Sequence, residues 1–143
     1  MRGWPAHDAD QEATTAMAMQ TDFTVILDDR PGTAALVGRT LGGAGVNVDG
    51  LSLFTSGGVA ILHVLVAPQE VAGARQAMRS GGIDLHGERG VWVAQIVDRP
   101  GEMGRLLGQL AAADVNCDLL YLDAHGRLVI GAENMDEVSH LLS

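Results

Sequence analysis

Polar residues of the kind that bind small charged molecules occur twice in this chain of 143 residues, in the same order and spacing. The two sets, 69 positions apart, are Asp29, Arg30, Pro31, Gly32, Asn47 and Asp49, and then Asp98, Arg99, Pro100, Gly101, Asn116 and Asp118. Leucine, alanine, glycine and isoleucine positions also coincide at this interval, with no gap. The chain is therefore an internal repeat of two similar units, too few for a solenoid.

These residue types suit the head group of an amino acid. A glycine in the first turn of a helix lets a carboxylate approach free N–H groups. Asparagine both donates and accepts hydrogen bonds, aspartate pairs with an ammonium group, and arginine binds a second carboxylate bidentately. A structural interpretation stays open for each. Proline is common at the first helical position, asparagine is common in turns, and an exposed arginine is often only a solvated charge.

Composition excludes several classes of function. The net charge of −9 disfavours nucleic acid and anionic membranes as partners. The single cysteine, Cys117, cannot form an internal disulfide, which fits the cytoplasm. No apolar run is long enough to span a membrane. We find no nucleophile–base pair, no metal-ligand spacing and no cofactor motif, so we expect no catalytic residue, metal or cofactor, and no enzyme activity.

The pattern of the first unit predicts the order β-α-β-β-α-β. Its expected elements are a strand over 23–27, a helix opened by Pro31, strands over 46–54 and 59–66, a helix opened by Pro68, and a short strand over 83–85. His63, within an apolar strand, is expected to be structural or interfacial.

The second unit repeats this order but ends early. We expect strands over 91–97, 115–122 and 128–130, with a helix after the first and another over 134–142. It lacks a counterpart of the last strand, which would leave a sheet edge with unpaired backbone groups. We expect a neighbouring strand to cover that edge, from the other unit or from a second subunit.

The strand–Asp-Arg-Pro-Gly–helix junction, followed by AGVNVD in one unit and ADVNCD in the other, resembles the ACT domain. The resemblance implies an α+β fold of two ferredoxin-like βαββαβ domains in tandem, the second without its last strand. The expected division is a disordered lead over 1–20, a first domain over 21–88 and a second over 89–143.

The resemblance also implies a function. ACT domains bind amino acids or similar small metabolites between paired domains, near the first strand–helix loop and the following Asn, and act allosterically on an attached or separate protein. The expectation is a cytoplasmic, non-catalytic regulatory homodimer with a separate effector enzyme. The alternative is an interaction module or regulatory subunit with vestigial ligand sites. Glu102 and Asp114, which replace Thr33 and Gly45, favour the first unit as the ligand site, although the ligand could also lie between the two units.

Overall fold

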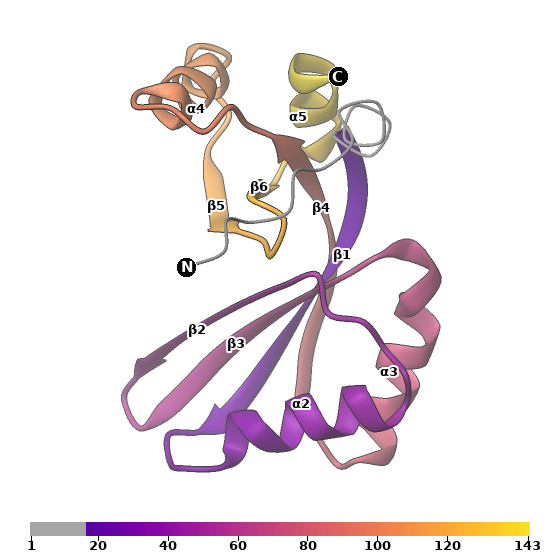
Figure 1. Cartoon of the computed structure of the whole chain (residues 1–143). Coiled ribbons are helices and arrows are strands. Elements are labelled where there is room, and N and C mark those ends of the chain that lie inside the picture. The colour runs from indigo at the N-terminus through magenta and orange to yellow at the C-terminus, as the bar shows by residue number, and fades with distance from the viewer. Residues whose placement is uncertain (1–16) are drawn as a thin grey trace, which may run out of the picture.

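Six antiparallel strands form one continuous sheet in the computed structural model, which describes residues 17–143 (Figure 1). The strands are β1 (Met17–Asp28), β2 (Gly50–Ser56), β3 (Val59–Val66), β4 (Leu85–Gln95), β5 (Cys117–Leu122) and β6 (Arg127–Ala132), in the order β2-β3-β1-β4-β6-β5. The connecting helices are α2 (Thr33–Gly43), the 3₁₀ turn η1 (Pro68–Glu70), α3 (Val71–Ser80), α4 (Glu102–Ala112) and α5 (Met135–Leu142). The expected α+β fold of two βαββαβ units, the second without a last strand of its own, is confirmed.

Strand β4 belongs to both units. Two separate strands were expected, over 83–85 and 91–97, and this is wrong, because one strand runs through the intervening residues. Gly87 and Gly90 look like turn residues in the sequence, but both pair with β1. A Cβ at Gly90 would lie 2.9 Å from the terminal methyl group of Met19, a flexible side chain that could shift to make room.

The first strand is also longer than expected and completes the second unit. Residues 17–20 were expected to be part of a disordered lead, but they belong to β1 and pair with residues 91–94 of β4. They occupy the position of the missing last strand of unit two. The expectation that the other unit would cover this edge is therefore confirmed. The expectation for residues 1–16 lies outside the described residues.

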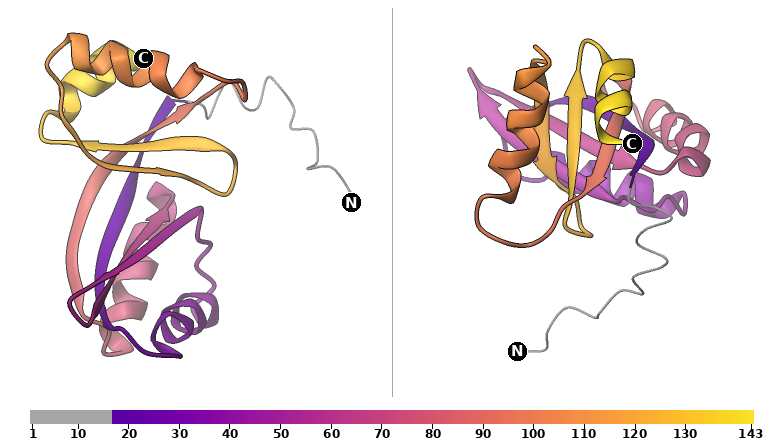
Figure 2. Two further views of the ribbon diagram at one scale, coloured as in Figure 1. Left: turned by 90° about the vertical axis from the view of Figure 1, so that its left-hand side faces the viewer. Right: turned by 90° about the horizontal axis from the view of Figure 1, so that it is seen from above.

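The sheet is curled, and it buries apolar side chains on both faces. Helices α2 and α3 pack on the half of the sheet built by unit one, and α4 and α5 pack on the half built by unit two (Figure 2). On the opposite face the halves meet around four fully buried side chains, Leu65, Val91, Val93 and Val129. Each contributes roughly 1.5–3 kcal/mol by burial, so the two units form one body. Within the described residues, no helix is long and apolar enough to cross a membrane.

Candidate functional site

The two repeated strand–helix junctions adopt the same tight turn. Gly32 has φ 93° and ψ −13°, and Gly101 has φ 87° and ψ −12°. These are the angles that glycine takes after proline in a type II turn. The expectation that Pro31 and Pro100 occupy the first helical position, with the glycines inside the first turn, is wrong. Each proline lies in the turn, each glycine caps its helix, and α2 and α4 begin one residue later. The recurrence of Pro-Gly thus has a structural cause.

The junction of unit one is open to solvent. Asp29 and Arg30 are exposed, and Arg30 Nε lies 3.5 Å from Asp28 Oδ2 with both side chains at least two-thirds exposed. Such a pair contributes little to stability. The Thr33 hydroxyl donates to the backbone carbonyls of Asp28 and Arg30 at 2.9 and 3.1 Å. A Cβ placed on Gly32 would meet no atom within 4 Å. The turn therefore presents exposed polar groups to solvent.

The junction of unit two is occupied by a side chain of its own. Glu102 is 6% exposed, and its carboxylate accepts hydrogen bonds from Arg99 and Arg105. The bond from Arg105, together with that from Arg99, lowers the pKa of Glu102. Arg99, a candidate ligand residue, thus already holds a carboxylate in this structure, while Asp98 and Pro100 are exposed.

Asn47 and Asp49 come together at the centre of the molecule. Asn47 Nδ2 donates to Asp49 Oδ1 at 3.0 Å, and Gln20 Nε2 donates to Asp49 Oδ2 at 3.2 Å. The Asp49 carbonyl accepts from the backbone N–H of Ala124 in the β5–β6 turn of unit two, at 2.8 Å. His125 Nε2 in the same turn lies 3.7 Å from Asp49 Oδ1. Asp49 is thus a tie between the two units.

The matching tie in unit two is made by Asp118. Arg89, the residue 69 positions after Gln20, donates to Asp118 Oδ1 at 2.8 Å and to the Ala132 carbonyl at 3.1 Å. Asn116 is exposed beside it. Asp49 and Asp118 therefore already have hydrogen-bond partners within the chain.

Within one unit the candidate residues do not form a single site. Gly32 precedes α2, whereas Asn47 follows it, and a helix of 11 residues is about 16 Å long. Among residues 17–143, no hydrogen bond or ion pair joins the Asp29–Gly32 turn to Asn47 or Asp49. A molecule the size of an amino acid cannot contact both ends of this helix at once.

A buried polar cluster that the sequence did not reveal joins the two units. Asp22 of β1 is fully buried, His63 Nδ1 of β3 lies 2.9 Å from its Oδ1, and the Tyr121 hydroxyl of β5 donates to its Oδ2 at 2.7 Å. Burial raises the pKa of Asp22, although His63 and Tyr121 oppose this. His63 is interfacial, as expected. Asp22 immediately precedes the strand expected over 23–27, so the sequence carried no signal that it would be buried.

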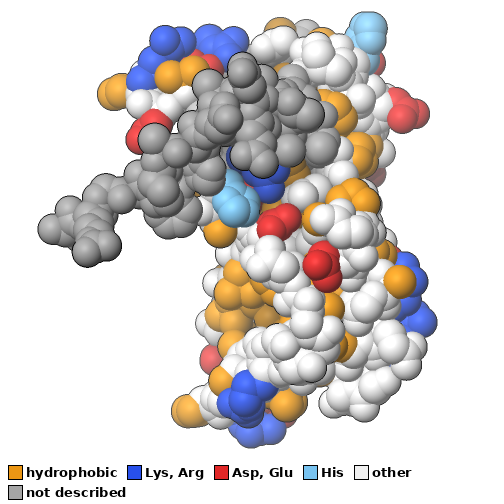
Figure 3. Space-filling view, turned by 45° about the vertical axis from the view of Figure 1, so that its right-hand side comes forward, with side chains coloured by type: hydrophobic (Ala, Val, Ile, Leu, Met, Phe, Trp, Pro, Cys, Tyr) orange, Lys and Arg blue, Asp and Glu red, His pale blue; other side chains and the backbone are white. Residues whose placement is uncertain are grey.

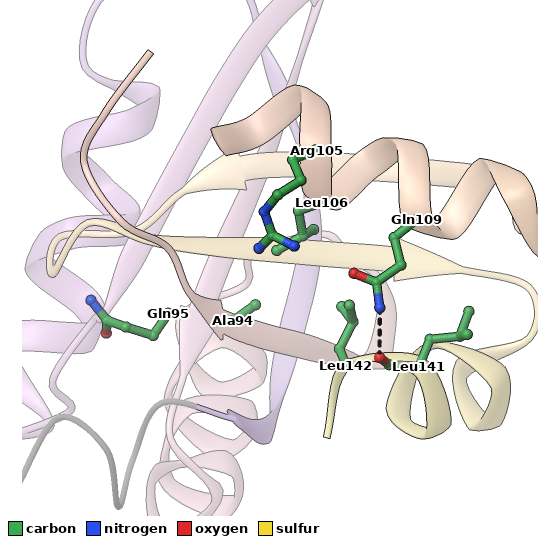
Figure 4. Close-up of a pocket in the computed structure, with 7 residues that line it drawn as sticks. All are labelled: Ala94, Gln95, Arg105, Leu106, Gln109, Leu141 and Leu142. Carbon is green, nitrogen blue, oxygen red and sulfur yellow. Dashed lines mark hydrogen bonds between the residues drawn. The ribbon is translucent and has the colours of Figure 1, made fainter. Parts of the chain in front are cut away.

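A small hollow opens between α4, α5 and the end of β4 (Figure 4). Its volume is about 190 Å³, and its lining consists of Ala94, Gln95, Arg105, Leu106, Gln109, Leu141 and Leu142. Gln109 Nε2 donates to the Leu141 carbonyl at 3.1 Å, and the Arg105 guanidinium binds Glu102. The Gln109 amide and the Arg105 guanidinium at its rim are thus engaged. Within the described residues no cluster of three His, Cys, Asp or Glu side chains could hold a metal ion.

The two edges of the sheet carry the same exposed leucines. Leu51 and Leu53 of β2 lie opposite buried residues of β3, and Leu120 and Leu122 of β5 lie opposite buried residues of β6. These four leucines lie on the helix side of the sheet but are 41–58% exposed, because no helix covers the edge strands. Figure 3 shows apolar side chains on the surface of the unit-one half.

Solved structures share this fold over nearly the whole chain. A protein of Bacteroides thetaiotaomicron matches with a TM-score of 0.71, 20% identity and 88% of each chain covered. The regulatory subunit of aspartate kinase from Thermus thermophilus matches with a TM-score of 0.67, 17% identity, and 88% of this chain and 91% of that chain covered. The Synechocystis aspartate kinase matches at 0.60 and 18% identity over 98% of this chain but 27% of the enzyme.

These likenesses establish the fold, which is the α+β fold of two ferredoxin-like units that the resemblance to ACT domains implied. At these identities they carry no residue roles to this chain. No protein-family model matches the sequence, and no curated protein does.

Proposed function

We propose that this protein is a non-catalytic regulatory protein that binds an amino acid or a similar small metabolite between ACT domains of two chains. The observation that carries this is the position of the candidate residues at opposite ends of α2. The open Gly32 turn and the exposed Asn47 each supply half of a site. A second chain would bring the two halves together, with Gly32 from one subunit and Asn47 from the other.

The sheet edges favour a homodimer. Strands β2 and β5 each have one unpaired side, and each exposes two leucines. Exposed strand edges with apolar side chains tend to pair with another chain. A two-fold dimer would use the same surface on both subunits. Pairing through the β2 strands would bury Leu51 and Leu53 of unit one in the interface.

The absence of catalysis is part of the proposal. Cys117 has its pKa raised by burial and by the charge of Asp118, which disfavours the reactive thiolate. The Asp22–His63 pair resembles a catalytic dyad. Its further hydrogen-bond partners are the hydroxyl groups of Thr24 and Tyr121, rather than a nucleophile in a cleft. The output would therefore pass to a separate effector enzyme, by analogy with the aspartate kinase regulatory subunits of the same fold. We place the protein in the cytoplasm, with neither nucleic acid nor membrane as its partner.

A second function has support from specific contacts. Asp49, Asp118 and Arg99 all have partners inside the chain. This favours an interaction module, or a regulatory subunit of a metabolic enzyme, in which the ligand sites are vestigial.

A thermal-shift screen of the twenty amino acids separates the two functions. A ligand that binds only the folded protein adds about 2.7 kcal/mol at a hundredfold excess over its dissociation constant. We expect one amino acid to raise the melting temperature of the wild type and of Asn116→Ala, but not of Asn47→Ala. If no amino acid shifts the wild type at millimolar concentration, the ligand-binding function is wrong and the interaction module takes its place.

A further inference from the structure

The carboxylate of Glu102 is held as a bound anion would be. Its Oε2 accepts from Arg99 Nε at 3.3 Å and Nη2 at 3.1 Å, and its Oε1 accepts from Arg105 Nη2 at 2.6 Å. Arg105 Nε adds contacts of 3.2 Å to both oxygens. Two guanidinium groups thus surround one carboxylate, which is the arrangement that arginine provides for anionic ligands.

The exposure of the three side chains supports this. Glu102 is 6% exposed, whereas Arg99 and Arg105 are 61% and 59% exposed. The two arginines shield the Glu102 carboxylate from solvent while they themselves stay exposed. The arginine groups close over Glu102 at the start of α4, where a carboxylate is also favoured by the helix dipole.

Unit one has no such clamp. Thr33 stands where unit two has Glu102, and Leu36 stands where it has Arg105. The Thr33 hydroxyl is bound to backbone carbonyls, and Leu36 is 45% exposed. The two turns have the same free space at the glycine, and they differ in the carboxylate that Arg99 and Arg105 hold in unit two.

We infer that Glu102 is a built-in substitute for a ligand carboxylate, which closes the junction of unit two to anionic molecules. Removing this side chain would turn Arg99 and Arg105 into a binding site for a small carboxylate. A consequence that rests on the proposed function is that only the junction of unit one takes up ligand, so each chain binds one molecule.

The test uses succinate as the probe and the Nε–H signals of Arg99 and Arg105 in NMR spectra as the readout. In the wild type we expect succinate to leave both signals unchanged. In Glu102→Thr, which restores the residue of unit one, we expect both signals to shift saturably, with binding at least tenfold tighter than to the wild type. Adding Arg105→Leu, again the residue of unit one, should abolish the shift.

Two results would overturn the inference. One is a folded Glu102→Thr protein that binds succinate no more tightly than the wild type. The other is wild-type protein whose Arg99 and Arg105 signals already respond to succinate. If Glu102→Thr does not fold, Glu102→Ala, which also removes the carboxylate, decides by the same comparison. Since succinate probes only unit two, a failed amino-acid screen leaves this test unaffected.

Discussion

At the scale of single residues, Gly32 and Gly101 have the same structural role in their turns, and only Gly32 is proposed to bind ligand. Both have positive φ, and a Cβ on either would meet no atom within 4 Å. The conformation therefore explains why both are glycine, and only ligand binding can distinguish them. The two positions serve as matched controls for each other.

We expect Gly32→Ala and Gly101→Ala to destabilise the protein by a similar amount, about 1 kcal/mol each, because alanine is strained at positive φ. Only Gly32→Ala should also weaken the binding of the amino acid that the screen selects, since its new methyl group projects into the open turn. Chemical denaturation and calorimetric titration measure the two effects. Equal loss of binding in both variants would contradict a site confined to unit one.

Tyr121 gives a spectroscopic test of the buried cluster, because it is the only tyrosine. Burial first, and then the charge of Asp22 and its hydrogen bond, raise the pKa of Tyr121 well above its usual value. A phenol whose pKa is raised by folding stabilises the protein below its unfolded pKa of about 10, and this stability is lost as the pH rises further. We expect no phenolate absorbance around pH 10 while the circular dichroism remains native. A reversible ionisation near pH 10 in the folded protein would show that the cluster is not closed.

At the scale of elements, the first four residues of β1, 17–20, complete the sheet of unit two. It covers the edge of β4 that unit two would otherwise expose. It also supplies Gln20, which is 8% exposed and bound to Asp49. Unit two therefore depends on the start of a strand whose remainder belongs to unit one.

We expect removal of residues 1–20 to destabilise unit two selectively, because residues 91–94 lose one hydrogen-bonded neighbour. Hydrogen exchange should accelerate at Val91 and Val93 more than in β3. Removal of residues 1–16 alone is the matched control and should leave exchange in β4 unchanged. Uniform acceleration in both units would show instead that the two units unfold as one.

The sequence was most informative where its pattern is local. Apolar alternation and helical spacing predicted the helices and most of the strands, and the fixed interval revealed the two units. It failed where the outcome depends on a distant partner. Gly87 and Gly90 look like a break, yet pairing with β1 keeps β4 continuous.

The candidate site shows the same division. Its turns could be predicted from Pro-Gly, although the helix start was misplaced by two residues. The contacts of Glu102 with Arg99 and Arg105 are local, at i,i+3 spacing, so the sequence held a signal for them that was not used.

At the scale of the whole molecule, the two ends of the sheet are candidate contact surfaces. Strands β2 and β5 carry leucines at equivalent positions of the repeat, so either edge could pair with a second chain. The proposed site requires the β2 edge, because Gly32 and Asn47 both belong to unit one.

We expect the wild type to be a dimer by light scattering after size exclusion, and Leu51→Lys with Leu53→Lys to be monomeric, because charged side chains oppose edge pairing. Leu120→Lys with Leu122→Lys is the matched variant on the other edge and should remain dimeric. A monomeric wild type, or a dimer that survives the β2 substitutions, would contradict this surface.

The most direct test of a site shared between two subunits is complementation between two inactive variants. Gly32→Ala and Asn47→Ala would each be unable to bind the selected amino acid. When equal amounts are unfolded and refolded together, mixed dimers contain one intact site, so about a quarter of the wild-type sites should return. Calorimetric titration of this mixture measures that fraction. Binding restored to about this level is the result we predict, whereas no binding in the mixture would contradict a site formed by two chains.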